Sequence, residues 1–114
     1  MDTADAERLA SLPSCPVETT LTLIGSKWEV LIVRDLLTGT KRFGELRRSM
    51  SGVSQKVLTS RLRAMEADGL VSREVFAEVP PRVEHSLMPL GRSLAPVLDA
   101  MERRGTDYKE SLAR

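Results

Sequence analysis

Residues 43–68 read FGELRRSMSGVSQKVLTSRLRAMEAD, and this stretch decides the fold of the 114-residue chain. Phe43, Leu46 and Met50 recur at i, i+3 and i+7, which is the spacing of a short helix with one apolar face. The segment 51–53 then interrupts the pattern with a glycine at its centre. The apolar spacing and the glycine together predict a helix of about two turns that ends in a tight turn.

A longer helix is predicted directly after this turn, over residues 54–68. Ser54 is placed as its N-terminal cap, and Asp68-Gly69 ends it. A short helix, a glycine-containing turn and a longer helix form the layout of a helix-turn-helix. The inward stripe of the second helix is predicted to be Leu58, Leu62 and Met65.

Downstream of Gly69 the pattern changes and predicts a β-hairpin. Residues 70–76 and 82–87 are typical of strands, and Glu78-Val79-Pro80-Pro81 joins them. Two prolines cannot lie inside a central ladder, so they mark the hairpin tip. A hairpin directly after the second helix is a wing. The predicted fold is therefore mainly α with a small β-hairpin wing, a winged helix-turn-helix.

Three helices are predicted upstream, over residues 3–11, 16–24 and 26–37. Thr3 would cap the first, and Gly25 would close the second in a left-handed conformation. The third would begin with a capping box from Ser26 to Glu29. The predicted inward residues are Val17, Leu21, Ile24, Trp28, Leu31, Ile32 and Leu36.

A long helix is predicted from about Pro89 to Gly105, with Pro96 bending or loosening it. Its apolar face would suit the core, a dimer interface or the wall of an effector pocket. We expect a dimer interface, because a helix at the chain end has little else to bury against. The residues of this face are Leu90, Leu94, Val97, Leu98 and Met101.

The chain is expected to divide into an N-terminal extension or short dimerisation helix (1–14), a winged helix-turn-helix domain (15–88) and a C-terminal dimerisation helix and tail (89–114). Its composition, with 41% hydrophobic and 29% charged residues, is that of an ordinary soluble domain. Cys15 is the one cysteine, which excludes an internal disulfide. No stretch approaches a membrane span, so the expected location is the cytoplasm.

Basic residues are concentrated in residues 41–63, which carry a charge of +6, while the whole chain carries only +1. Such a block can bind a polyanion through counterion release, although a solvated helix face is the alternative. The helix-turn-helix favours DNA, with backbone contacts fixing the docking register. The predicted phosphate contacts are Lys41, Arg42, Arg47, Ser54 and Arg82.

The outward face of helix 54–68 lies opposite its apolar stripe and carries side chains suited to a major groove. Arginine can bind guanine with two hydrogen bonds, glutamine can bind adenine, and hydroxyls can bind bases or phosphates. A polar outer face is also what any surface helix shows. The predicted base-reading residues are Gln55, Lys56, Thr59, Ser60 and Arg63.

Several motifs between Cys15 and Gly105 resemble those of one known family. They are CPVE (15–18), GSKW (25–28), KRFGELR (41–47), SQKVLT (54–59), RL (61–62), EADGL (66–70), EVPP (78–81) and PLG (89–91). This set resembles the HxlR-type regulators, which are related in architecture to the MarR regulators. The resemblance implies a homodimeric repressor or activator that contacts its partner through terminal helices and reads a palindromic operator with one recognition helix per half-site. Met88 departs from the pattern, because a capping threonine would ordinarily precede Pro89.

Cys15 allows two interpretations. It precedes a helix that begins at Pro16, and a helix N-terminus stabilises a thiolate. It could equally pack as a small apolar residue. The family resemblance implies a sensor of electrophiles or oxidants at this position. With one cysteine per chain, oxidation would form a disulfide between subunits, a mixed disulfide or an adduct.

The remaining alternatives are an enzyme, a protein-docking module and a regulator controlled by a non-covalent small ligand. The lone His85 has no evident nucleophile, and neither a phosphate-binding glycine loop nor a cluster of metal ligands is present in the sequence. We therefore expect no enzyme activity, cofactor or metal, and take His85 as a structural or surface residue. Winged helices also serve as docking surfaces, but docking would not need the basic and polar face of helix 54–68.

Overall fold

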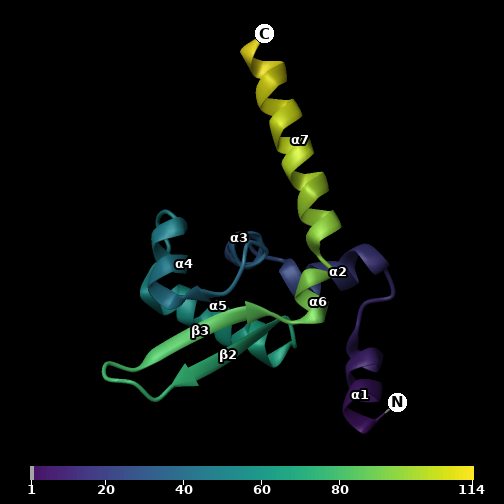
Figure 1. The fold of residues 1–114 in the computed structure, drawn as a ribbon. Helices are drawn as coiled ribbons and strands as arrows, with labels where there is room; N and C mark the ends of the chain where they lie inside the picture. The colour runs from purple at the N-terminus through teal and green to yellow at the C-terminus, as the bar shows by residue number, and fades with distance from the viewer. Residues whose placement is uncertain (1) are drawn as a thin grey trace.

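The helix-turn-helix forms as predicted in the computed structural model, which describes residues 2–114 (Figure 1). Helix α4 (Phe43–Ser49) leads through the turn into helix α5 (Gln55–Ala67). Gly52 in this turn has φ +87°, a left-handed conformation that side chains with a Cβ rarely adopt. The Ser54 hydroxyl accepts a hydrogen bond from the Val57 N–H at 3.1 Å, which confirms Ser54 as the cap of α5.

One apolar core holds α5 against the rest of the domain. The predicted inward stripe of α5 is buried, and so are apolar residues of α4 and of helix α3 (Lys27–Leu36). Burial of this kind stabilises the fold by about 25 cal/mol for each Å² of apolar surface. The fully buried large side chains are Ile32, Val33, Leu46, Met50, Leu58, Leu62, Met65 and Leu70.

The wing consists of strands β2 (Val71–Phe76) and β3 (Arg82–Leu87), which pair antiparallel with Val71 opposite Leu87. A third strand, β1 (Lys41–Arg42), pairs with β3 and makes it the central strand, in the order β1-β3-β2. The sequence did not predict β1, because two residues are too few to show an alternating pattern. The sheet thus joins the wing to the chain segment that enters α4.

The N-terminal helices have different ends from those predicted. Helix α1 (Thr3–Ser11) is capped by Asp2, whose carboxylate accepts the Asp5 N–H at 2.8 Å, and Thr3 is its first residue. Helix α2 (Pro16–Ile24) ends at Gly25 with φ −75°, so the predicted left-handed closure is wrong. Glycine is needed there for space, because a Cβ would collide with a carbonyl oxygen of the preceding turn.

The predicted inward faces of these helices are partly correct. Ile24, Ile32 and Leu36 are buried and Trp28 and Leu31 are half-buried, but two residues of α2 are exposed: Val17 and Leu21. The Ser26 hydroxyl accepts the Glu29 N–H at 3.3 Å. Within residues 2–114 the return bond that would complete the predicted capping box is absent, because Glu29 packs into the interior.

The predicted single C-terminal helix is two helices, α6 (Pro89–Arg92) and α7 (Ala95–Ala113). Pro96 lies in the first turn of α7, where a missing N–H costs no hydrogen bond, and therefore starts a helix instead of bending one. Gly105 does not end the helix, which continues to Ala113. Figure 1 shows α7 extending away from the winged domain, and every residue beyond Leu98 is exposed. No helix in residues 2–114 is long and apolar enough to cross a membrane.

Candidate nucleic-acid interface

Four of the five predicted base-reading residues lie away from the buried stripe of α5, and Gln55 lies in the first turn, beside that stripe. These positions follow from the helical period of about 3.6 residues. The α5 N-terminus also presents backbone N–H groups beyond the one that Ser54 caps. All five side chains are exposed: Gln55, Lys56, Thr59, Ser60 and Arg63.

Basic side chains flank the beginning of α5. Arg42 precedes α4 and Arg47 lies on it, and both are exposed, whereas Lys41 on β1 is half-buried. Arg47, Arg48 and Gln55 line one shallow groove between α4 and the start of α5. Arg48 belongs to the same basic block as Arg42 and Arg47, and its side chain is exposed. This groove brings two guanidinium groups beside the first turn of the recognition helix.

Arg82 is less available than the sequence indicated. Its guanidinium lies 4.0 Å from the centre of the Phe76 ring and forms ion pairs with Glu78 at 3.3 Å and Glu84 at 3.6 Å. The contact with the Phe76 ring arises because Phe76 faces Arg82 in the β2–β3 register. In this structure the arginine at the wing is therefore held by carboxylates of its own hairpin.

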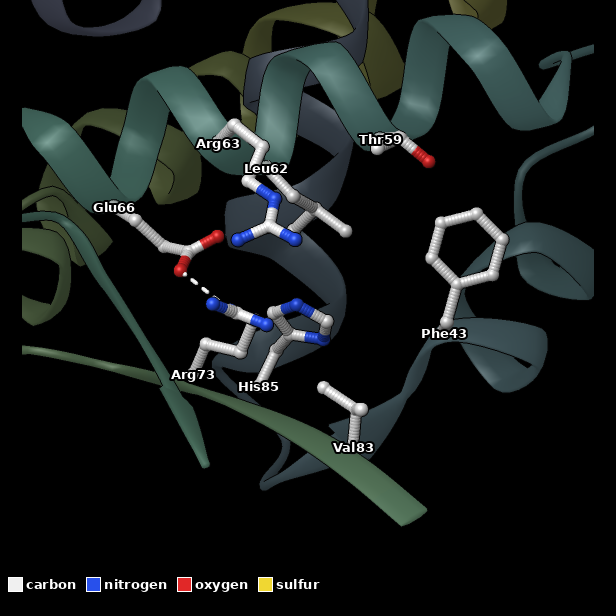
Figure 2. Close-up of a pocket in the computed structure, with 8 residues that line it drawn as sticks. All are labelled: Phe43, Thr59, Leu62, Arg63, Glu66, Arg73, Val83 and His85. Carbon is white, nitrogen blue, oxygen red and sulfur yellow. Dashed lines mark hydrogen bonds and ion pairs between the residues drawn. The ribbon is translucent and has the colours of Figure 1, made fainter. Parts of the chain in front are cut away.

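A cavity of about 200 Å³ separates α5 from the sheet (Figure 2). Phe43 and Val83 form apolar walls, and the Arg73 Nε donates to Glu66 Oε1 at 3.0 Å. Figure 2 shows the Arg63 guanidinium directed from α5 into this space, toward Arg73 and His85. A residue predicted to read bases thus points toward the sheet in the unbound structure.

His85 is buried at this cavity, with 4% of its surface exposed, and is not a surface residue. Burial lowers the pKa of His85, because the charged imidazolium loses its hydration. The Glu66 carboxylate partly opposes this shift, and the Arg73 and Arg63 guanidinium groups add to it. The imidazole is therefore neutral at physiological pH. Sequence reasoning placed His85 on a strand, but nothing local indicated that α5 covers that face.

Cys15 is a free, exposed cysteine at the N-cap of α2. Its side chain makes no capping hydrogen bond, so the thiol is not tied into the helix end. The Thr19 hydroxyl donates to the carbonyl oxygens of Cys15 and Pro13, each at 3.1 Å. These contacts fix the backbone at the start of α2 and leave the sulfur accessible.

The predicted dimer stripe divides into two groups. Leu94 and Leu98 are buried in the core of the single chain, so they are not free to contact a partner. The reason is that the break between α6 and α7 lets the start of α7 pack against the domain. The exposed members of the stripe are Leu90, Val97 and Met101.

A helix-turn-helix closed by a β-sheet wing, with a polar and basic outer face on its second helix, defines the winged helix-turn-helix class of proteins. Residues 23–113 match the family model described as HxlR-like helix-turn-helix, and the chain belongs to this family. The predicted resemblance is thereby confirmed. Proteins of this type are transcriptional regulators, and the relatives below are named as such or as redox regulators.

The HTH-type transcriptional regulator YdeP of Bacillus subtilis is 46% identical over 98 residues, covering 86% of this chain and 77% of YdeP. The redox regulator HypR in its oxidised form superposes with a TM-score of 0.77 and 46% identity, covering 82% of this chain and 96% of HypR. The transcriptional regulator YodB of B. subtilis in its reduced form gives a TM-score of 0.69 and 35% identity, covering 80% of this chain and 90% of YodB.

Proposed function

We propose that this regulator is a homodimer that binds a palindromic DNA operator, with α5 of each subunit in the major groove. The outer face of α5 is the observation that carries the proposal. Its polar and basic side chains are exposed on one side of a helix whose opposite side is locked into the core, which is the requirement for a rigid reading element. The groove lined by Arg47 and Arg48 would bind phosphates beside it.

Unpartnered apolar surface supports the dimer. Val17 and Leu21 on α2 are exposed although their spacing is that of an inward face. α7 carries further exposed apolar residues beyond the point where it leaves the domain. Association of these helices in two subunits would remove that surface from water. The residues proposed for the contact are Val17, Leu21, Leu90, Val97, Met101, Tyr108 and Leu112.

Selection from random double-stranded DNA, followed by salt-titrated binding, tests the proposal. The expected outcome is a palindromic consensus whose half-sites lie about 34–36 Å apart or at a multiple of this distance. Affinity for the consensus should exceed that for unrelated DNA by about 10³-fold or more. Recovery of no consensus would contradict the proposal and favour a docking module. Sedimentation equilibrium of the free protein tests the dimer separately.

A second proposal concerns Cys15, which we infer to be a thiol sensor. Its exposure at the N-terminus of α2 and the likeness to HypR, named a redox regulator, support this role. Diamide is a diazene that oxidises thiols. The Cys15 thiols of two subunits would give two protons and two electrons to its N=N bond and form one disulfide bond, and diamide would be reduced to the corresponding hydrazine. The predicted result is loss of operator binding and a dimer band on non-reducing gels.

Cys15→Ser is the matched control, because it keeps the size of the side chain and removes the thiol. The variant should bind the operator as the wild type does and should not respond to diamide. Unchanged operator affinity of the wild type after diamide treatment would contradict the sensor. It would leave DNA binding intact as a separate conclusion.

A further inference from the structure

The cavity between α5 and the sheet has the size of a small-molecule site. It is open to solvent on one side and has a volume of about 200 Å³, and an engineered apolar cavity of about 150 Å³ is known to admit benzene. Phe43, Leu62 and Val83 form its apolar walls, and they come from α4, α5 and β3. Polar groups line the remaining side, so the cavity combines an apolar compartment with a charged one (Figure 2).

Two buried polar atoms of this lining have no hydrogen-bond partner within residues 2–114. They are His85 Nδ1 and Glu66 Oε2. His85 is 96% buried, and leaving such an atom unpaired costs about 1–3 kcal/mol. Native proteins rarely leave buried polar atoms unpaired, and each one that remains calls for an explanation such as strain, a catalytic role or a bound water or ion. The orphaned imidazole nitrogen therefore indicates an occupant that can hydrogen-bond to it.

The charges of the lining identify the class of occupant. Arg73 is paired with Glu66, whereas Arg63 forms no ion pair within the described residues. Because His85 is neutral, the lining keeps one uncompensated positive charge. A carboxylate would accept hydrogen bonds from the Arg63 guanidinium and from His85 in its neutral tautomer, which carries the proton on Nδ1. One negative charge and a compact apolar body would match both compartments.

We propose that this cavity binds a small monocarboxylate with a compact apolar body, and that its binding weakens operator recognition. The regulatory part rests on the proposed DNA-binding function. Arg63 and Thr59 belong both to the cavity lining and to the proposed base-reading face. An arginine held by a carboxylate beneath α5 cannot at the same time reach a base edge. The ligand and the operator therefore compete for Arg63.

The single histidine of the chain supplies a direct probe of the cavity. We would titrate benzoate into untagged, DNA-free protein and follow the imidazole ¹H resonances of His85 by NMR. Benzamide, which has the same ring and no charge, is the matched ligand control. The expected result is a saturable shift with benzoate at a Kd of about 1 mM or tighter and a much weaker response to benzamide. An unmoved His85 resonance, or equal responses to both compounds, overturns the proposed site.

Two variants assign the shift to the cavity. Arg63→Gln should weaken benzoate binding about tenfold or more, because it removes the charge-assisted hydrogen bond. Arg61→Gln removes the same charge from an exposed position of α5 outside the cavity lining and should leave benzoate binding unchanged. Val83→Phe places a ring in the apolar compartment and should abolish the shift. Benzoate binding that survives both Arg63→Gln and Val83→Phe contradicts the assignment.

Operator binding with and without benzoate tests the regulatory part. The wild type should lose affinity in proportion to benzoate occupancy, and Val83→Phe should not respond. If benzoate shifts His85 but leaves operator affinity unchanged, the regulatory part is wrong and the site remains. If no operator exists, the proposed function fails, whereas the NMR titration still decides the site.

Discussion

Salt dependence of operator binding gives the sharpest prediction, because the structure shows which cations are free. Arg42, Arg47 and Arg48 are exposed, Lys41 is half-buried, and Arg82 is held by two carboxylates of its own hairpin. If Lys41, Arg42, Arg47 and Arg48 each contact one phosphate and Arg82 does not, a subunit makes four phosphate contacts. A dimer then makes about eight. The log of the association constant should then fall with a slope of about −7 against log salt, a loss of about 10⁴-fold between about 50 and 200 mM.

Arg47→Ala removes two of these contacts per dimer and should make the slope shallower by about 2. Fluorescence anisotropy on the selected operator at four or more salt concentrations measures this slope. Arg104→Ala is the control, since it removes the same charge from the exposed part of α7. A slope that is unchanged in Arg47→Ala, or equally reduced in Arg104→Ala, refutes the assignment of phosphate contacts.

Four further predictions concern base reading, the packing at two glycines, and pH. Gln55→Ala should weaken operator binding by about 1–3 kcal/mol and leave binding to unrelated DNA nearly unchanged, as competition gel shifts would show. Gly91→Ala should destabilise the fold by about 1–3 kcal/mol in urea denaturation, because the added Cβ collides with the Leu70 carbonyl and the Leu87 side chain. Gly105→Ala, where a Cβ meets nothing within 4 Å in the interior of α7, should stabilise the fold by about 0.5–1 kcal/mol. Because the folded-state pKa of His85 lies below the ordinary histidine value of 6.5, the unfolded chain binds more protons between those two pKa values. The unfolding free energy should therefore fall as the pH drops below 6.5 toward the folded-state pKa, and this part of the pH dependence should be absent from His85→Gln.

The predictions for Gln55, Gly91 and His85 each have a result that contradicts them. Equal losses on operator and unrelated DNA would show that Gln55 does not read a base. A Gly91→Ala protein as stable as the wild type would mean that the contact with Leu70 relaxes freely. If the unfolding free energies of wild type and His85→Gln run parallel between about pH 5 and 7, His85 does not titrate differently in the folded state.

The helix-turn-helix and wing were predictable because their signals are local. The stripe Leu58, Leu62 and Met65 sets the orientation of α5, and the outer face follows from the same period. The prolines at 80 and 81 mark the hairpin tip in both sequence and structure. The fold class and the exposed polar face of α5 therefore required no knowledge of tertiary contacts.

The features that were missed depend on longer-range packing. Leu90, Leu94 and Leu98 keep a spacing of four residues across the junction of α6 and α7, so the apolar pattern does not reveal the break. The cavity is assembled from α4, α5 and both wing strands, and its charges meet only after folding. Nothing in the sequence indicated that Arg82 is paired, because its ion pair with Glu84 depends on the side-chain conformations in the folded hairpin. Sequence periodicity contains none of this information.

The short strand β1 has a mechanical consequence. It hydrogen-bonds to the middle strand of the wing and leads without a break into α4, where the Arg42 N–H donates to Glu45 Oε1 at 2.9 Å. Wing and helix-turn-helix are thereby coupled, and a displacement of the hairpin is transmitted to α4. In a dimer, the wing and the helix-turn-helix of each subunit would therefore approach DNA as one rigid unit. Any adjustment to the distance between two half-sites would then fall to the junction of α6 and α7.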